Sequence, residues 1–545
     1  MIRSLLVLSL LVGLLWSGFL AWVGIHTTGD SVAYFRTALE LSEHGALNMN
    51  PIWPPLYPML LGGMTMAVGL PAEAAGLLSG LLLTALLFSS GWIVAQATRD
   101  GLLAAAVILF CCGWWELLYV FRVAWSEQLY AALVAVHLVA IVRHCRSGTL
   151  LDFALAAVTA SLVVLSRYLG YALLGIFLVY SAATVLRRGD RRRHLAVLVA
   201  ASSPLLGWLL FNLYRTSTLH GERTPTDLTA LENLQLLASV FSAQLWHTPM
   251  LTALLLSGVV AMGVVLWRGQ GWTRTLLLYV SAYLMLYAAL LVYAASSVQM
   301  DEINPRFLSP ILPTVLLGII LAASGLAQQL PKARGPILQS VTALLLVGVL
   351  GGMGSWKDGM ATLVSGVNTT ASHQQGGFSA SQTAESLNAL FAERLSQQSR
   401  LAVGLLTSES NGNKASVMVM RRAVLEGEGL QDPRYTALSK RMVSISLELE
   451  GKERELLAWS PRLMADAADV QHALHDALAE TGAEELLVIT RKKVLRKTGV
   501  PDMDLATLSQ LRCEAEASIT PYLIYTCSEA VSRDTTPARS VHREG

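Results

Sequence analysis

The sequence predicts a polytopic α-helical membrane protein that carries a soluble α/β domain at its C-terminal end. Hydrophobic residues make up 53% of the 545 residues and charged residues only 14%, and the mean hydropathy is +0.50. This composition is typical of chains with many apolar spans. The basic residues are scattered through short segments between these spans rather than gathered on one face, which argues against nucleic-acid binding.

Eleven apolar runs are long enough to cross a bilayer, which takes about twenty residues for about 30 Å of hydrocarbon. The first is long and has no small-residue cleavage site after it, so we expect a retained helix rather than a signal peptide. The segment 56–70 is apolar but short and follows several prolines, which favours an interfacial helix. The spans are expected at 4–24, 74–97, 101–118, 126–144, 150–166, 168–186, 194–213, 250–267, 275–298, 308–329 and 336–354.

The positive-inside rule orients these spans. With the N-terminus in the cytoplasm, thirteen basic residues fall on the cytoplasmic side and six on the opposite side, and the chain after residue 354 lies outside. The weakest step is the turn at Ser166-Arg167-Tyr168. Without this turn the five arginines between 187 and 193 would face outward, which argues for it. The outward arginines are Arg36, Arg122, Arg167, Arg215, Arg223 and Arg306.

Beyond residue 354 the composition becomes that of a soluble domain, so the chain divides into a membrane part and a soluble part. We expect a membrane domain at 1–354 with its first outer loop at 25–58, a linker at 355–377, an extracytoplasmic α/β domain at 378–532 and a disordered tail at 533–545. Apolar patterns in the soluble part predict strands at 400–406, 485–490 and 522–527. Helices are expected at 381–397 and 466–481, which favours a three-layer arrangement.

Two cysteines fall together in the C-terminal domain. Cys513 precedes a predicted strand, and Cys527, fourteen residues later, ends it. In an oxidising compartment a disulfide between them is plausible, and the alternative is two unrelated buried thiols.

The first outer loop is the most informative stretch of the membrane domain. It contains Asp30, a candidate amphipathic helix with Arg36, and the proline-stiffened aromatic turn Trp53-Pro54-Pro55-Leu56-Tyr57-Pro58. Asp30 lies just past the first span, where a partly desolvated carboxylate suits a general base. The alternative is an N-cap for a helix that starts at Ser31. We interpret this loop as the floor of a site at the membrane–water interface.

The same topology brings further acids and arginines to the outer face. Together they are expected to form a site for an anionic lipid headgroup and a proton acceptor. Glu127 has an alternative role in the first turn of a helix capped by Ser126, where it complements the helix dipole. Arg306 could instead anchor the helix end by reaching the headgroup region. The candidate substrate-binding residues are Arg36, Tyr57, Arg122, Glu127, Arg167, Tyr168, Arg223, Asp301, Glu302 and Arg306.

Motifs for other chemistries are missing from the sequence. The outward histidines His26, His44, His220 and His247 share no metal-ligand spacing, so a divalent metal is possible but not indicated. No phosphate-binding glycine loop and no nucleophile elbow are present. No nucleotide or redox cofactor is therefore expected.

Several short motifs, in this order and on this face, resemble those of the GT-C superfamily of integral-membrane glycosyltransferases. The resemblance covers roughly residues 1–355 and is strongest to the branch with protein O-mannosyltransferases and lipid A aminoarabinose transferases. The motifs are Gly29-Asp30-Ser-Val-Ala-Tyr34, Pro54-Pro55-Leu56-Tyr57-Pro58, Trp125-Ser126-Glu127, Leu165-Ser166-Arg167-Tyr168-Leu169-Gly170 and Arg306-Phe307-Leu308-Ser309-Pro310-Ile-Leu-Pro313.

The resemblance implies transfer of a sugar from a polyprenyl-phosphate donor to a protein, glycolipid or polysaccharide acceptor. It implies a cell-envelope enzyme of the bacterial cytoplasmic membrane, with its C-terminal domain in the periplasm. Asp30 would act as the base of an inverting displacement or orient the acceptor, and arginines would hold the donor phosphate. Two residues depart from the family pattern: Trp53 stands where a lysine is usual, and Ser31 stands where a second acid often occurs. Because of Trp53, the phosphate contact made by that lysine is not carried over to this chain. Because of Ser31, the sequence does not support a mechanism that uses two carboxylates or a metal ion.

The main competing hypothesis is a transporter or flippase for a lipid-linked or anionic substrate. Such a protein should show charged or broken helices near the middle of the bilayer, often in repeated halves. In this chain the ionisable residues gather at the rim and no halves repeat. An O-antigen ligase type of enzyme and a non-catalytic scaffold are further alternatives.

Overall fold

The computed structural model divides the chain into two compact units, Met1–Val364 and Ser365–Gly545. In the first unit it describes residues 1–327, apart from 27–28, 48–50, 188–189, 222–225, 227, 299–302 and all of 247–270 except 259 and 262–264. In the second unit it describes six strands and the helical residues 390, 393–394, 471–472, 474–475 and 478–479.

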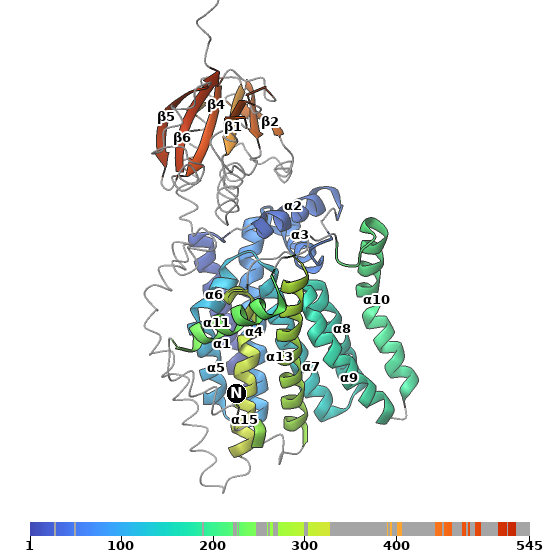
Figure 1. Cartoon of the computed structure of the whole chain (residues 1–545). Coiled ribbons are helices and arrows are strands. Elements are labelled where there is room, and N and C mark those ends of the chain that lie inside the picture. The colour runs from blue at the N-terminus through green and yellow to red at the C-terminus, as the bar shows by residue number, and fades with distance from the viewer. Residues whose placement is uncertain are drawn as a thin grey trace, which may run out of the picture. The chain divides into compact units, whose positions relative to one another are not determined.

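The described part of the first unit is a bundle of helices (Figure 1). Its helices are α1 (Ile2–Val23), α2 (Gly29–His44), α3 (Leu56–Val68), α4 (Pro71–Thr98), α5 (Gly101–Gly113), α6 (Trp115–Arg122), α7 (Ser126–Ser147), α8 (Leu150–Ser166), η1 (Tyr168–Gly170), α9 (Tyr171–Arg187), α10 (Arg191–Thr216), α11 (Ala230–Trp246), α13 (Gly271–Ser297), α14 (Pro305–Leu308), η2 (Ser309–Ile311) and α15 (Leu312–Ala327).

The polytopic helical fold class is confirmed. By length and composition seven of the described helical segments could cross a membrane, or eight if the bent pair α5–α6 counts as one span. The predicted span 101–118 is therefore wrong in detail, because the chain bends by 63° between α5 and α6. The predicted span 150–166 is the 17-residue helix α8, short for a straight crossing. The predicted spans 250–267 and 336–354 fall almost entirely outside the described residues.

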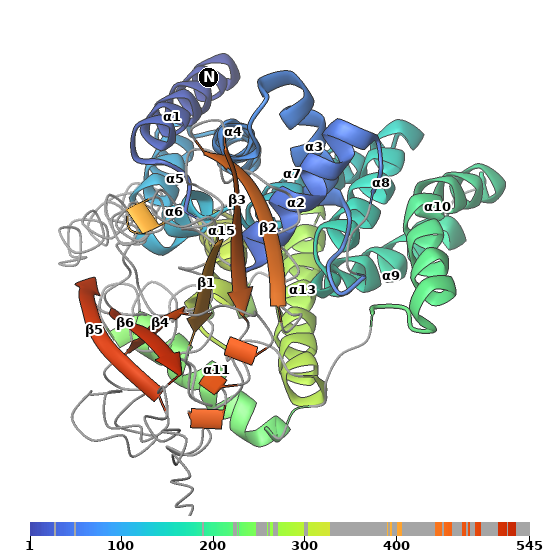
Figure 2. The same ribbon diagram turned by 90° about the horizontal axis from the view of Figure 1, so that it is seen from above.

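The core of the bundle is built around α4, which packs against α1 on one side and against α7 and α15 on the other. Gly13 on α1 and Gly80 on α4 let the two backbones approach closely, since a Cβ on Gly80 would lie 2.6 Å from the Gly13 carbonyl oxygen. The span from Pro305 to Leu326 and helix α7 are mostly buried, whereas α10 is mostly exposed. Figure 2 shows α8, α9 and α10 together on one side, with α10 at the edge. The buried helices are therefore the ones that can hold side chains rigidly.

The first loop returns to the bundle through a backbone bridge. His26 pairs with Val123 in parallel: its amide donates to the Arg122 carbonyl at 2.9 Å and its carbonyl accepts from the Ala124 amide at 3.0 Å. After this bridge α2 and α3 pack on each other, with Gly62 against the Leu41 side chain. The bridge fixes the start of α2 beside the start of α7.

The second unit contains a six-stranded mixed sheet with the order β2-β3-β1-β4-β6-β5. The central strands β3, β1 and β4 are parallel, and the strands on either side pair antiparallel. Buried Val403, Leu487 and Val488 lie in these central strands, as expected for strands covered on both faces. The strands are β1 (Arg400–Leu405), β2 (Met442–Leu449), β3 (Lys452–Trp459), β4 (Glu485–Arg491), β5 (Leu511–Ile519) and β6 (Tyr522–Glu529).

Three of these strands, β1, β4 and β6, match the strands that the sequence predicts, whereas β2, β3 and β5 were not predicted. The missed strands are rich in Glu, Ser, Lys and Arg, which hides the apolar pattern of a strand. The expected helices 381–397 and 466–481 fall mostly outside the described residues, although Leu474 and Leu478 are helical and buried. Cys513 and Cys527 occupy paired positions of β5 and β6 and are joined by a disulfide.

Candidate active site

Four charged side chains from distant segments meet at one end of the bundle. Asp30 lies in the first turn of α2 and Glu127 in the first turn of α7. Arg167 lies between α8 and η1, and Arg306 lies in the first turn of α14. All four lie at helix ends. Because successive spans run in opposite directions, these helix ends lie at the same end of the bundle. We call these four residues the charge network.

The charge network alternates in sign along its contacts. Arg167 Nη1 lies 2.5 Å from Glu127 Oε2, and the other Glu127 oxygen, Oε1, accepts from Arg306 Nε. Arg306 Nη2 in turn donates to Asp30 Oδ2 at 2.7 Å. One acid is thus shared by two arginines, and one arginine is shared by two acids.

Burial divides the charge network into an inner and an outer part. The side chain of Glu127 is 1% exposed and that of Arg306 9%, whereas that of Asp30 is 30% exposed. Burial is the largest influence on Arg167 and works against its charge, but the Glu127 carboxylate, together with Tyr287 and Tyr34, raises the pKa of the guanidinium overall. Arg167 therefore remains a cation that Glu127 must neutralise.

Backbone contacts around Val123 place Glu127 at its position. The bridge between His26 and Val123 holds the segment before α7, and the Gln128 side chain donates to the carbonyls of Phe121 and Val123. Helix α7 begins at Ser126 with Trp125 as its N-cap, so the predicted capping role of Ser126 does not match the structure. Similarly, α2 begins at Gly29, which puts Asp30 inside the helix rather than at its cap.

The short helix α14 fixes the backbone position of Arg306. The Asn304 side chain caps α14 by accepting from the Arg306 amide at 2.9 Å, and the Tyr287 hydroxyl donates to the Phe307 carbonyl at 2.7 Å. The Arg306 guanidinium lies over the Trp125 ring, 4.0 Å from its centroid. Arg306 is thus held by a cation–π contact as well as by two carboxylates.

Arg167 depends on a glycine three residues later. The Gly170 amide donates to the Arg167 carbonyl at 2.8 Å, which closes the turn between α8 and α9. A Cβ on Gly170 would lie 2.7 Å from the Val163 carbonyl, so the turn packs against α8 only with glycine there. The Arg167 guanidinium also lies 5.8 Å from the Phe307 ring centroid.

Tyr34 and Ser126 extend the charge network with neutral groups. The Tyr34 hydroxyl donates to Ser126 Oγ at 3.3 Å, and Ser126 Oγ donates to Glu127 Oε2 at 3.4 Å. Burial, reinforced by the charges of Asp30 and then Glu127, raises the pKa of Tyr34 above its ordinary value. Tyr34 therefore stays a neutral hydrogen-bond donor beside two acids.

Three other candidate residues, Tyr57, Arg122 and Tyr168, lie near this end and make different contacts. Tyr57 is fully buried, with its ring centroid 5.2 Å from that of Tyr34. Arg122 is buried, and its guanidinium lies 6.0 Å from the Phe19 ring centroid. The Tyr168 hydroxyl donates to the Pro51 carbonyl at 2.9 Å and accepts from Trp208 and Asn212 at 3.1 Å each. Tyr168 thus anchors the first loop to α10.

The remaining candidates cannot be placed. Arg223, Asp301 and Glu302 fall outside the described residues, and so does the side chain of Arg36, which lies in α2. Within the described part of the chain, no group of three or more His, Cys, Asp or Glu residues could hold a metal ion.

Three residues of this end were not predicted as site residues, namely Tyr34, Trp125 and Ser126. Tyr34 follows Asp30 by four residues, which puts both on one face of α2, so helical spacing could have found it. Trp125 and Ser126 directly precede Glu127, but their neighbours across the bundle come only from packing.

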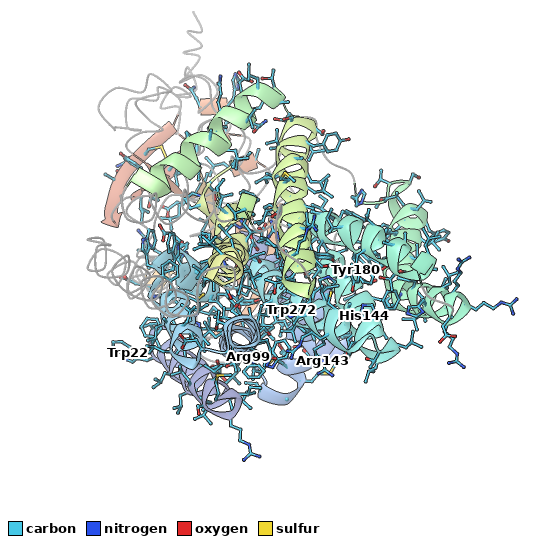
Figure 3. The ribbon with its side chains drawn as sticks, turned by 90° about the horizontal axis from the view of Figure 1, so that it is seen from below. Trp22, Arg99, Arg143, His144, Tyr180 and Trp272 are labelled. Carbon is cyan, nitrogen blue, oxygen red and sulfur yellow. A yellow bond between two sulfur atoms is a disulfide. The ribbon has the colours of Figure 1, made fainter. Side chains whose placement is uncertain are left out.

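The opposite end of the bundle has a different character, and Figure 3 views the unit from there. Arg143 Nε donates to Asp152 at 2.7 Å with its side chain 50% exposed. Arg146 donates to Gln96, and its guanidinium lies 6.0 Å from the ring centroid of Trp272, which Figure 3 labels near Arg143. His144 Nδ1 and the Tyr180 hydroxyl are 2.7 Å apart nearby.

Comparison with solved structures shows the fold of this chain. It is similar to ArnT from Cupriavidus metallidurans bound to undecaprenyl phosphate, with a TM-score of 0.51 and 14% identity over 95% of this chain and 97% of that one. The apo state of the same ArnT gives a TM-score of 0.51 and 14% identity over 96% and 98%. No family model and no curated protein matches the sequence. The fold that the GT-C resemblance implies is confirmed.

Proposed function

We propose that this protein transfers a sugar from a polyprenyl-phosphate donor to an acceptor hydroxyl at the outer face of the bacterial cytoplasmic membrane. The observation that carries the proposal is the charge network, two arginines meeting two carboxylates at one end of an ArnT-like bundle. Arginine suits phosphate oxygens, and a carboxylate beside it suits proton removal. The ArnT with bound undecaprenyl phosphate supports a lipid-linked donor for this fold.

In the proposed reaction Asp30 removes the proton from the acceptor hydroxyl. The acceptor oxygen forms a bond to the anomeric carbon while the bond from that carbon to the phosphate oxygen breaks, which inverts the configuration. The polyprenyl phosphate leaves with the bonding electrons, and its charge is stabilised by Arg306 and Arg167. Asp30 suits the base role because its side chain is 30% exposed, whereas Glu127 is enclosed between the two arginines.

The disulfide supports an extracytoplasmic position for the C-terminal unit. Disulfides persist in oxidising compartments, and Cys513 and Cys527 are both buried in the sheet that they join. We therefore place this unit in the periplasm, as part of a cell-envelope enzyme. The proposed acceptor is a protein, a glycolipid or a polysaccharide.

The charge distribution favours an enzyme over a transporter. In the described spans, Asp, Glu, Lys and Arg lie near the helix ends, as Glu127, Arg143 and Arg146 do on α7. Transporters instead use charged groups or broken helices near the middle of the bilayer. Of these features the described spans show the break between α5 and α6, but charged groups near their ends. His137, in the middle of α7, is held by the Tyr279 hydroxyl at 2.7 Å and by the Ala156 carbonyl at 3.0 Å. These contacts are consistent with a structural role.

The test is an assay of polyprenyl phosphate release by purified protein in detergent. A panel of polyprenyl-phosphate sugars is offered together with a broad extract of envelope acceptors. Wild type is compared with Asp30→Asn and with Glu43→Gln, which makes the same chemical change at an exposed position of the same helix. We expect release by wild type and by Glu43→Gln, and loss of release in folded Asp30→Asn protein.

Each other outcome changes the proposal in a defined way. Release that survives Asp30→Asn would keep the enzyme class and move the base to another acid, with Glu127 and Asp301 as the next candidates. If wild type released nothing from any donor, glycosyl transfer would be refuted and transport of a lipid-linked substrate would be tested next.

A further inference from the structure

Arg306 is shared between two acids that differ in how firmly they are held. Its Nε donates to Glu127, which is buried and also bound by Arg167 and Ser126. Its Nη2 donates to Asp30, the most exposed member of the charge network. The Trp125 ring fixes the guanidinium plane from one face. The contact with Glu127 is therefore fixed by its surroundings, whereas the contact with Asp30 is open to exchange.

The contact between Asp30 and Arg306 ties the proposed base to the cation that would hold the donor phosphate. Oδ2 of Asp30 accepts a hydrogen bond from Arg306 at 2.7 Å, which holds the carboxylate against the guanidinium, while the carboxylate keeps further lone pairs that could take a proton. A phosphate offers several anionic oxygens to the same guanidinium edge and can bind it in a bidentate manner. A phosphate that arrives at Arg306 would therefore compete directly with Asp30.

We infer that the Asp30–Arg306 ion pair is an exchangeable contact, which the donor phosphate opens by taking the place of Asp30 on Arg306. This inference rests on the proposed function and adds that the donor binds before Asp30 accepts the proton. Before the donor binds, Arg306 keeps Asp30 engaged. Once phosphate oxygens occupy Nη2, the Asp30 carboxylate is released to receive the acceptor proton. Glu127 meanwhile keeps Arg306 in place as its positioning residue.

The test measures binding separately from transfer, with undecaprenyl phosphate as the probe. Its affinity for purified protein in nanodiscs is measured for wild type, Asp30→Asn, Glu43→Gln and Glu127→Gln. Because Asp30→Asn removes the competitor for Arg306, we expect it to bind roughly two- to fivefold more tightly, the factor that a partly exposed ion pair contributes. Glu43→Gln removes one negative charge from the same helix and should bind like wild type. Glu127→Gln should bind more weakly, since both arginines lose their anchor.

The outcomes separate the exchange from the proposed function. If wild type binds and transfers but Asp30→Asn binds no more tightly than wild type, the exchange is refuted and the function stands. If wild type neither binds the lipid nor transfers sugar, the function itself fails. If Asp30→Asn does not fold, initial rates of wild type decide: an ordered pattern with the donor first supports the exchange, and random order overturns it.

Discussion

The charged side chains at the two ends of α7 differ in how far they are buried. At its start, Glu127 is enclosed by Arg167 and Arg306 with 1% of its side chain exposed. At its end, Arg143 pairs with Asp152, and half of the arginine side chain stays exposed although the Asp152 side chain is only 5% exposed. Ser147 and Thr149 also donate to Asp152, so this acid does not depend on Arg143 alone. Burying charges costs free energy that pairing only partly returns, whereas exposed pairs cost and contribute little. The buried arrangement is therefore the one that stability alone does not explain, and it is where we place function.

The largest expected effect comes from making the same substitution at both ends. Arg306→Gln leaves Glu127 and Asp30 without their shared cation, so it should lower the free energy of unfolding by about 3–5 kcal/mol, the usual result of breaking a buried pair. Arg143→Gln breaks a pair whose arginine is half exposed, and should cost at most about 1 kcal/mol. Thermal unfolding in detergent measures both effects.

The rate of polyprenyl phosphate release gives a second comparison of the same two variants. Arg306→Gln should abolish polyprenyl phosphate release, whereas Arg143→Gln should leave it close to the wild-type rate. Equal losses of stability at the two ends would contradict the distinction between a buried pair and a pair with a half-exposed arginine. Equal losses of activity would contradict the placement of the site.

A smaller effect is expected from the two tryptophans that lie beside arginines. Trp125→Leu removes a buried ring 4.0 Å from the Arg306 guanidinium, a desolvated cation–π contact worth about 2 kcal/mol. Trp272→Leu removes a partly exposed ring 6.0 Å from Arg146, a contact worth about 0.5–1 kcal/mol at exposed sites. KM for the donor should rise only in the first variant. A rise in KM with Trp272→Leu would mean that the opposite end also takes part in donor binding.

The smallest expected effect concerns Tyr34 and pH. Its raised pKa means that the folded protein keeps the phenol protonated, so the stabilisation is complete below the unfolded pKa of about 10 and declines as pH rises above it. Tyr34→Phe should cost about 1 kcal/mol at neutral pH through the lost hydrogen bond to Ser126. Above pH 10 the variant should lose less stability than wild type. Unfolding curves at pH 7 and pH 11 test this, and an unchanged difference between the two proteins would contradict it.

The sequence predicted the positions of the charged residues better than their partners. Asp30, Glu127, Arg167 and Arg306 all stand at predicted span ends on one face, which the alternation of spans could indicate. That Arg306 contacts both Asp30 and Glu127 depends on how α2, α7 and α14 pack, which periodicity does not encode. Tyr168 is an example: its substrate-binding role stays a prediction, and its hydrogen bonds to Pro51, Trp208 and Asn212 could not be read from the sequence.

The spans themselves were easier to predict, because about twenty consecutive apolar residues leave few alternatives in a membrane. Breaks inside an apolar run were harder. The 63° bend after Gly113 interrupts a run that reads as continuous, since Gly113-Trp114 carries no proline. The soluble unit was the hardest, because Ser, Glu, Lys and Arg occupy many positions of its β2–β3 hairpin and hide the apolar pattern of a strand.

The charge network also has a consequence for biogenesis. Chains enter the membrane with the N-terminus first, so α2, α7 and the turn after α8 are made long before α14. Glu127 and Arg167 are 40 residues apart in sequence, but Asp30 and Arg306 are separated by 276. Glu127 and Arg167 can therefore pair as soon as the early segments are inserted. Asp30 can pair with Arg306 only after α14 has been made. A chain that stops before residue 306 would contain the proposed base and Arg167 but would lack the arginine that contacts Asp30.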